Sequence, residues 1–245
     1  MKDNIFTVLS NREISFKTFK MVLEGDTSSI AGSGQFVEIS LPGFFLRRPI
    51  SVNDAEPGRL TMVYKVVGKG TGKMSAMAPG ETLEILCGLG HGFHPEACRT
   101  DALLLGGGVG TAPLYLLAKE LIAGGKAVTV VLGFNKAEEA MLVEDFKDLG
   151  ARVEIATMDG SIGTKGFVTD ILAKGGIKYD HFYGCGPLPM LKAVCAGIEG
   201  KGEISLEERM GCGCGICYGC TCHTHKGPRR ICADGPVFKT EDIIW

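Results

Sequence analysis

The pattern of apolar and polar positions changes character near residue 98. Before that point, short apolar runs at 36–41, 60–67 and 82–86 are separated by Pro-Gly turn signals, a pattern typical of β-strands. A helical pattern at 71–77 is long enough for one or two turns. Residues 1–97 are therefore predicted to form a small antiparallel β-barrel.

From residue 98 to residue 200, strand-like and helix-like patterns alternate. The predicted strands lie at 101–105, 128–132, 153–156 and 181–183, and the predicted helices at 112–123, 137–148, 169–174 and 188–198. Such alternation is typical of a parallel sheet whose strands are joined by crossover helices. This part is predicted to be a doubly wound nucleotide-binding domain.

Residues 201–245 form a third predicted piece. One strand is predicted at 203–206, and a loop rich in cysteine and glycine follows it. A piece of this size buries too little apolar surface to be stable by itself, so a metal site is expected to supply the missing stability.

Composition and charge narrow the class of protein. The chain has 245 residues, of which 22% are charged, and its net charge is −2, so it lacks the basic excess of a nucleic-acid-binding protein. Segment 1–6 is polar, and no signal peptide is expected. No apolar run approaches the roughly 18 residues that span a bilayer. A cytoplasmic protein with no nucleic-acid or membrane partner is expected.

Cysteine is unusually frequent, and its distribution is uneven. The chain has ten cysteines, and six of them fall within a window of 21 residues. In a reducing compartment such a cluster indicates metal binding or catalysis rather than disulfides. The six are Cys212, Cys214, Cys217, Cys220, Cys222 and Cys232.

One choice of four cysteines has the spacing of a plant-type [2Fe–2S] site, C-x4-C-x2-C with a distant fourth ligand. These predicted ligands are Cys212, Cys217, Cys220 and Cys232. The glycines between them allow the backbone to wrap closely and to direct N–H groups at the sulfurs. Cys222 is then interpreted as a small loop residue, like Cys214.

Two other metal sites fit the same loop. The spacing of Cys214, Cys217 and Cys220 also resembles the start of a [4Fe–4S] motif, although the expected Cys-Pro does not follow. A structural zinc site could instead combine cysteines with His223 or His225. Spacing alone favours [2Fe–2S].

A glycine-rich turn follows the predicted strand at 101–105 and precedes the helix at 112–123. A turn in this position lets a pyrophosphate approach the N-terminus of the helix. The alternative is a tight turn that binds nothing. The third glycine of the usual fingerprint and the acidic residue after the second strand are both missing. The sequence therefore does not show whether NAD or NADP binds. It reads Gly106-Gly107-Gly108-Val109-Gly110-Thr111.

The order of these features resembles the ferredoxin–NADP reductase superfamily, in which a flavin barrel precedes a nicotinamide domain. The segment Arg48-Pro49-Ile50-Ser51 is similar to its Arg-x-Tyr-Ser flavin motif. The resemblance implies that Arg48 neutralises the FAD pyrophosphate and that the Ser51 hydroxyl lies near flavin N5. Ile50 stands where many members carry an aromatic residue.

Three further segments match cofactor contacts of the same superfamily. Two are flavin contacts, and Gly70-Thr71 also makes sense as a helix N-terminus that can hold a phosphate. The third is similar to a Cys-Gly-Pro segment beside the nicotinamide. They are Val63-Tyr64-Lys65, Gly70-Thr71 and Cys185-Gly186-Pro187 with Met190.

The C-terminal segments 207–212 and 231–238 resemble the electron-transfer subunits of dihydroorotate dehydrogenase B. The resemblance implies three cofactors, namely FAD, a [2Fe–2S] cluster and NAD. It also implies a separate FMN-containing catalytic subunit, in a heterotetramer of two copies of each chain, that oxidises dihydroorotate in pyrimidine biosynthesis. Because nicotinamides exchange hydride and iron–sulfur clusters exchange single electrons, a flavin must stand between them. No acid–base catalytic residue is expected in this chain.

Two alternative functions remain open from the sequence. A related flavin and iron–sulfur subunit, of a sulfide dehydrogenase or a ferredoxin-dependent transhydrogenase, would carry nearly the same motifs. A zinc-stabilised binding module without redox activity would explain the cysteines, but it would not explain 48–51 together with Gly70-Thr71.

Overall fold

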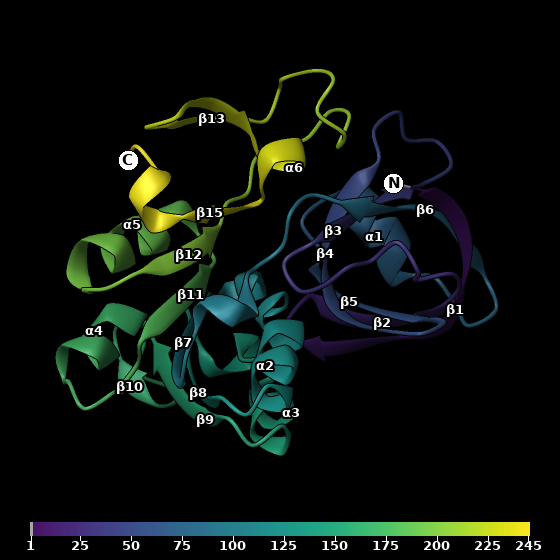
Figure 1. Cartoon of the computed structure of the whole chain (residues 1–245). Helices are drawn as coiled ribbons and strands as arrows, with labels where there is room; N and C mark the ends of the chain where they lie inside the picture. Colours follow the sequence, from purple (N-terminus) through teal and green to yellow (C-terminus); the bar gives the residue numbers. More distant parts are fainter. Residues whose placement is uncertain (1) are drawn as a thin grey trace.

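The computed structural model describes residues 2–245. Its N-terminal part is the predicted barrel, closed by six strands in the order β1-β2-β5-β4-β3-β6, with every neighbouring pair antiparallel (Figure 1). Alternating side chains such as Phe6, Met21 and Val37 fill the barrel interior. The strands are β1 (Lys2–Ser15), β2 (Thr18–Glu24), β3 (Phe36–Ser40), β4 (Arg48–Glu56), β5 (Arg59–Lys65) and β6 (Thr82–Leu89).

One short helix, α1 (Lys69–Ser75), is attached to the barrel. It begins two residues before the predicted 71–77, because the Thr71 hydroxyl oxygen accepts N–H groups from Val67 at 3.0 Å and Gly68 at 3.3 Å. The Met74 side chain is fully buried in the barrel core and holds the helix in place.

The second part is a seven-stranded sheet in the order β10-β9-β8-β7-β11-β12-β15. All pairs are parallel except β12 with β15. The predicted doubly wound architecture is therefore confirmed. The strands are β7 (Asp101–Gly107), β8 (Ala127–Phe134), β9 (Arg152–Thr157), β10 (Thr164–Lys165), β11 (His181–Cys185), β12 (Gly202–Ser205) and β15 (Val237–Lys239).

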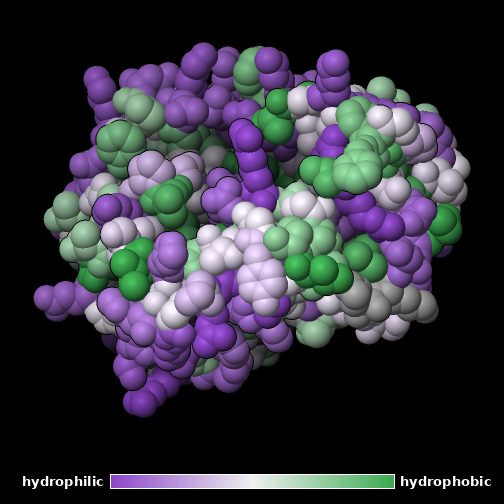
Figure 2. Space-filling view, turned by 90° about the horizontal axis from the view of Figure 1, so that it is seen from above, coloured by the Kyte–Doolittle hydropathy of each residue, from purple (hydrophilic) through white to green (hydrophobic). Residues whose placement is uncertain are grey.

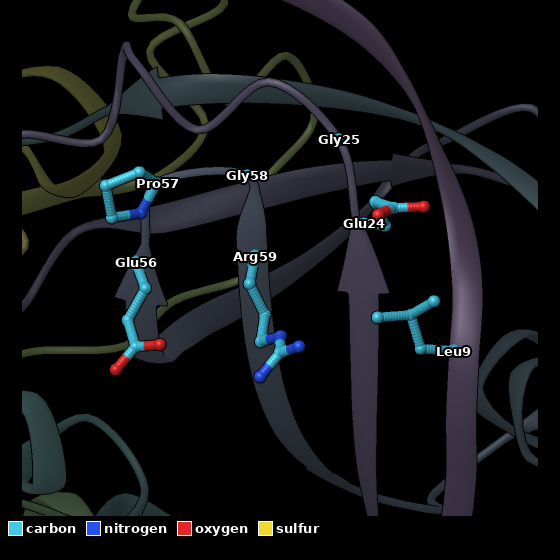
Figure 3. A pocket seen from close by; sticks show the side chains of 7 residues that line it. All are labelled: Leu9, Glu24, Gly25, Glu56, Pro57, Gly58 and Arg59. Atoms are coloured by element: carbon cyan, nitrogen blue, oxygen red, sulfur yellow. The ribbon is translucent and has the colours of Figure 1, made fainter.

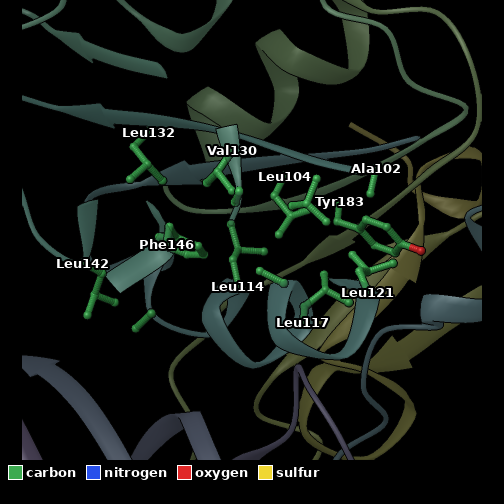
Figure 4. Packing of buried hydrophobic residues seen from close by; sticks show 14 of the residues in the cluster. Ala102, Leu104, Leu114, Leu117, Leu121, Val130, Leu132, Leu142, Phe146 and Tyr183 are labelled. Carbon is green, nitrogen blue, oxygen red and sulfur yellow. The ribbon is translucent and has the colours of Figure 1, made fainter. Parts of the chain in front are cut away.

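Helices cover both faces of this sheet. Helices α2 (Leu114–Ala123) and α3 (Val143–Asp148) pack on one face, and Figure 4 shows α2 directing Leu114 and Leu117 toward the strands. Helices α4 (Val168–Ala173) and α5 (Leu188–Gly197) pack on the other face. No helix within residues 2–245 is long and apolar enough to cross a membrane.

The predicted helix at 137–148 is wrong in its first half. Residues Ala137–Glu139 form a single 3-10 turn, and α3 starts only at Val143. Leu142 has a φ of 59°, a left-handed conformation that interrupts the helical hydrogen bonds. Its side chain is buried in the core, so packing outweighs the helical propensity of this segment. Other 3-10 turns are Pro95–Ala97, Gly108–Thr111 and Thr240–Asp242.

The C-terminal segment is built onto the edge of the sheet. Strands β12 and β15 extend the sheet, and the segment between them carries the cysteine loop, a hairpin of β13 (Thr221–Thr224) and β14 (Gly227–Arg230), and α6 (Ile231–Asp234). Its apolar side chains share one core with Phe36 and Leu89 of the barrel. Figure 1 shows this segment above the sheet, beside the end of the barrel that carries β3.

Candidate functional site

The two predicted flavin segments of the barrel lie against each other. Arg48 begins β4, and its guanidinium rests on the backbone of Gly70, where an added Cβ would lie 2.2 Å from Arg48 Nε. The guanidinium also stacks on the Phe44 ring at 4.7 Å. A positive group is thus held beside a helix start, which suits a pyrophosphate. Ser51 follows on the same strand and is partly exposed.

The predicted flavin segment on β5 is mostly buried. The Tyr64 ring lies in the barrel core and its hydroxyl donates to Asn11 Oδ1 at 3.0 Å, so its side chain is not free to contact a flavin. Burial raises the pKa of the Tyr64 phenol, which stays protonated. Val63 packs toward the nucleotide domain, and Lys65 lies 3.6 Å from the Glu139 carboxylate.

The glycine turn meets the Cys-Gly-Pro segment at the end of the sheet. Strands β7 and β11 are neighbours, although β11 comes much later in the chain, so the sheet has its switch point between them. A Cβ on Gly110 would lie 2.6 Å from Gly186 N, and one on Gly107 would lie 2.5 Å from Met190 Sδ. Glycine is therefore required for this close approach.

Two other side chains lie at the same switch point, where the general rule for such sheets places a ligand crevice. Thr111 is fully buried and its hydroxyl has no hydrogen-bond partner among residues 2–245. Burial is the main cause that raises the pKa of the Cys185 thiol, to about 12, so this cysteine is neutral and is not a nucleophile. Val109 and Leu188 stay exposed at the rim. The crevice offers backbone groups, a hydroxyl and apolar surface, as a dinucleotide site does.

Asn53 links the barrel to the glycine turn, and the sequence analysis missed it. Asn53 lies on β4 two residues after Ser51, it is 1% exposed, and its Nδ2 donates to Ala112 O at 2.8 Å. The flavin strand is thereby tied to the dinucleotide turn. A buried polar residue inside a strand was the available signal, but its partner is 59 residues away.

Backbone N–H groups surround the four predicted cluster ligands. Cys212 Sγ accepts from Ile216 N at 3.3 Å and Cys217 N at 3.4 Å, and Cys232 Sγ accepts from Gly215 N at 3.1 Å. Each of the other two sulfurs accepts one N–H group at 3.4 Å. Such donors stabilise thiolates and tune an iron–sulfur cluster. Although desolvation opposes it, these N–H groups bring the pKa of Cys212 down to about 6.

The predicted ligands come together in two pairs. Cys212 Sγ accepts the backbone N–H of Cys217, and Cys220 Sγ accepts the backbone N–H of Cys232, each at 3.4 Å. Residues 2–245 contain no three Cys, His, Asp or Glu side chains grouped as a metal ion requires. Two pairs suit a binuclear cluster, in which each iron takes two protein ligands. Burial raises the pKa of the Cys232 thiol to about 12, so a bound metal would be needed to deprotonate it.

The two remaining cysteines of the loop differ in position. The Cys214 thiol lies beside Cys212, and desolvation followed by that neighbour raises its pKa. Cys222 lies on β13, and burial raises its pKa. His223 and His225 are exposed. The choice of Cys212 over Cys214 as a ligand stays a prediction.

The pocket in Figure 3 lies elsewhere, at the turn between β4 and β5. It is lined by Leu9 and by residues from two chain turns, with Glu24 and Glu56 on either side of Arg59. None of the predicted cofactor residues lines it. This acidic, open hollow does not suit a pyrophosphate.

The chain matches known families in the two regions that carry the predicted cluster site and the predicted dinucleotide site. Residues 207–244 match the iron–sulfur cluster binding domain of dihydroorotate dehydrogenase B, and residues 104–196 match the oxidoreductase NAD-binding domain. Two relatives are each named as the electron transfer subunit of dihydroorotate dehydrogenase B (NAD(+)). The one from Shouchella clausii is 40% identical and the one from Bacillus pumilus is 42% identical, and each match covers 99% of this chain and 98% of the relative.

The chain belongs to the family of dihydroorotate dehydrogenase B electron-transfer subunits. It is therefore an oxidoreductase subunit that uses an iron–sulfur cluster, FAD and NAD. The paired cysteines fit the cluster, the Arg48–Gly70 contact fits FAD, and the glycine turn against Gly186 at the switch point fits NAD.

Solved structures show the same architecture for this family member. The structure of an NADH-dependent reduced ferredoxin-NADP oxidoreductase, which is described for flavin-based electron bifurcation, has a TM-score of 0.89 and 32% identity. The match covers 98% of this chain and 90% of that one. A ferredoxin NADP+ reductase from Neisseria gonorrhoeae with bound FAD and NADP has a TM-score of 0.68 and 19% identity, covering 78% and 88% of the two chains. That likeness shows the fold alone.

Proposed function

We propose that this chain delivers electrons from a dihydroorotate-oxidising, FMN-containing catalytic subunit through a [2Fe–2S] cluster and FAD to NAD+. The observation that carries the proposal is the placement of the predicted sites in one chain. The glycine turn lies against the Cys185–Pro187 segment, and the predicted cluster ligands lie in two pairs in the C-terminal segment. The chain is about 40% identical to curated electron-transfer subunits. The flavin supplies the conversion between hydride and single electrons.

At the nicotinamide end, residues of this chain would bind and orient the dinucleotide. The turn 106–111 would receive the pyrophosphate, because the backbone is open at Gly108 and the Thr111 hydroxyl has no hydrogen-bond partner among residues 2–245. Gly186 and Pro187 would hold the nicotinamide beside the flavin, and Arg48 would balance the charge of the flavin pyrophosphate. The Cys185 thiol stays protonated, because burial raises its pKa to about 12.

At the cluster end, the chain would face its partner. Ile216 and Tyr218 lie between predicted ligands and are 79% and 65% exposed. Arg230 stacks on the Tyr218 ring at 5.0 Å and donates to Gly215 O at 2.9 Å, which holds the loop in shape. Exposed apolar and aromatic side chains around a redox centre suit a docked protein. Figure 2, which looks down on this face, shows apolar groups beside a hollow.

The assembly is proposed to be a heterotetramer with two copies of each subunit, working in the cytoplasm. No disulfide joins any of the cysteines among residues 2–245, which agrees with a reducing compartment. The size of the complex formed with the catalytic subunit, measured by light scattering, tests this stoichiometry directly.

A second function within the same class has a specific observation behind it. The 32% identity to the NADH-dependent reduced ferredoxin-NADP oxidoreductase spans almost the whole chain. A role in ferredoxin-linked transhydrogenation would use the same three cofactor sites with another partner.

Reconstitution separates the two functions. The purified chain is mixed in turn with a dihydroorotate dehydrogenase catalytic subunit and, together with ferredoxin, with the partner chain of a ferredoxin–NADP oxidoreductase. We expect a stable complex and dihydroorotate-dependent NADH formation in the first mixture only. Complex formation and NADPH-dependent ferredoxin reduction in the second mixture only would replace the proposal by its alternative.

A further inference from the structure

Glu38 is a buried carboxyl at the junction of the barrel and the cluster segment. It lies on β3, between Leu86 of β6 and Pro49 of β4, and it is 2% exposed. On the same outer face of β3, Phe36 packs into the apolar core shared with Ile231. In Figure 1, β3 is on the side of the barrel nearest the cluster loop. Glu38 is thus a buried carboxyl beside an apolar contact, with Arg47, Arg48 and the Cys212 thiol as its charged or titratable neighbours.

The Glu38 side chain meets the backbone of the cluster loop. A Cβ on Gly213 would lie 2.4 Å from Glu38 Oε1 and 2.7 Å from Glu38 Cγ. Gly213 also has a φ of 63°, so glycine is required there for two reasons. Gly213 stands between Cys212 and Cys214, so the carboxyl presses on the loop where the first predicted ligand is placed.

The other side of Glu38 is the predicted flavin strand. Glu38 pairs with Pro49, and its neighbour Ile39 pairs with Arg48. One side chain therefore spans the boundary between the segment predicted to hold FAD and the loop predicted to hold the cluster.

Stability does not explain a glutamate in this place. Its Oε1 is buried and has no hydrogen-bond partner among residues 2–245. Such a group destabilises a fold by the cost of its desolvation, and a leucine of similar length would pack better in this contact. Residues that break local rules in this way are concentrated at functional sites.

We infer that Glu38 is a positioning residue, which fixes the cluster loop against the flavin strand and thereby sets the rate of electron transfer between FAD and the cluster. The inference rests on the proposed function, because it takes 48–51 as the flavin segment and Cys212 as a ligand. In the direction from NADH, the flavin would accept the hydride, which is two electrons and one proton, and NAD+ would be left. The two electrons would then pass singly to the one-electron cluster, and the proton would be released to solvent.

Anaerobic rapid mixing with NADH tests the inference, because flavin bleaching and cluster reduction have separate absorption signals. The variants are Glu38→Ala, Glu38→Gln and, as a control, Glu24→Ala, which removes an exposed carboxylate of the same barrel. We expect flavin bleaching to be unchanged in all three. Cluster reduction should slow about tenfold in Glu38→Ala, since small misplacements of reacting groups cost one to two orders of magnitude. Glu38→Gln keeps the shape and should restore the rate.

The reduced cluster's electron paramagnetic resonance spectrum gives a second readout. It should change in Glu38→Ala and match the wild type in Glu38→Gln. Wild-type rates and spectrum in Glu38→Ala would overturn the inference, and so would a Glu38→Gln variant as slow as Glu38→Ala. A wild-type cluster that NADH cannot reduce would instead contradict the proposed function.

A double-mutant cycle covers the case in which Glu38→Ala loses the cluster. Gly213→Ala places a methyl group against Glu38, and it should disturb the cluster spectrum by itself. In Glu38→Ala with Gly213→Ala the space is vacated, so the combined effect should be smaller than the sum of the two. Additive effects would mean that the contact does not position the loop.

Discussion

At the scale of single residues, cluster binding depends on which cysteine sulfurs accept hydrogen bonds from backbone N–H groups. Cys217 pairs with Cys212 and accepts Gly219 N at 3.4 Å. Replacing it with serine removes a soft thiolate that iron requires. We expect Cys217→Ser to lose the cluster absorption while FAD stays bound and NADH still reduces ferricyanide.

Cys214→Ser is the matched control for this variant. It changes a thiol of the same loop that is predicted not to be a ligand, so iron and sulfide content should stay at the wild-type level. Loss of iron from Cys214→Ser, with full retention in Cys217→Ser, would reverse the ligand assignment.

Gly110 is a second residue whose identity is dictated by a contact. A methyl group there would lie 2.6 Å from Gly186, backbone against backbone, so the turn and the Cys-Gly-Pro segment would have to separate. Gly110→Ala is expected to raise the KM for NADH about tenfold or more and to leave FAD content unchanged.

Gly197→Ala is the control for Gly110→Ala, because an added Cβ at Gly197 meets nothing within 4 Å. Steady-state NADH–ferricyanide kinetics compare the two variants. Equal KM values would show that the turn does not bind the dinucleotide.

At the scale of elements, the cluster segment is held by the barrel as well as by the sheet. Phe36 of β3 is 4% exposed within the core that contains Ile231 and Cys232. Phe36→Ala leaves a cavity and should lower the free energy of unfolding by about 3 kcal/mol. The cavity borders the cluster segment, so iron should also be released at a lower temperature.

Phe16→Ala removes the same side chain from the turn between β1 and β2, where Phe16 is 46% exposed. Its effect on stability should be within about 0.5 kcal/mol. Thermal unfolding and iron release of the two variants, followed together, make the comparison. A Phe36→Ala variant that holds iron as firmly as Phe16→Ala would contradict this role of β3.

The elements also show what the sequence could predict. Periodicity located the barrel, the parallel sheet and most helices, because those signals are local. It failed at 137–148, where the left-handed Leu142 and its burial divide the segment. It did not reveal that β12 and β15 extend the nucleotide sheet, because their pairing joins residues more than 30 positions apart.

For the site, as for the fold, the sequence predicts only those features whose signals are local. Motifs predicted Arg48, the glycine turn and the spaced cysteines as site residues, since each of these signals lies within a short segment. Asn53 and Glu38 were missed, because their meaning depends on Ala112 and Gly213, distant residues that only the fold brings near. The sequence can show a polar residue within a buried strand, but only the structure shows which residue it contacts.

At the scale of the whole molecule, function requires the barrel and the nucleotide domain to keep a fixed relation. The buried hydrogen bond from Asn53 to Ala112 joins the predicted flavin strand to the dinucleotide turn. Asn53→Ala should slow flavin reduction by NADH about tenfold through misalignment of donor and acceptor, with little change in FAD content.

Asn4→Ala is the control, since Asn4 makes an exposed side-chain bond to Asp26 O at 3.2 Å. Its rate of flavin reduction should equal that of the wild type. A wild-type rate in Asn53→Ala would show that this bond does not set the alignment.

The central claim is that electrons cross the whole chain from a partner enzyme to NAD+, by way of the cluster. The most direct measurement is NADH formation from dihydroorotate and NAD+ by the reconstituted complex, comparing the wild-type chain with Cys217→Ser. We predict one NADH per orotate with the wild type and none with Cys217→Ser, although that variant still oxidises NADH with ferricyanide. NADH formation at the wild-type rate by a cluster-free Cys217→Ser complex would contradict the account.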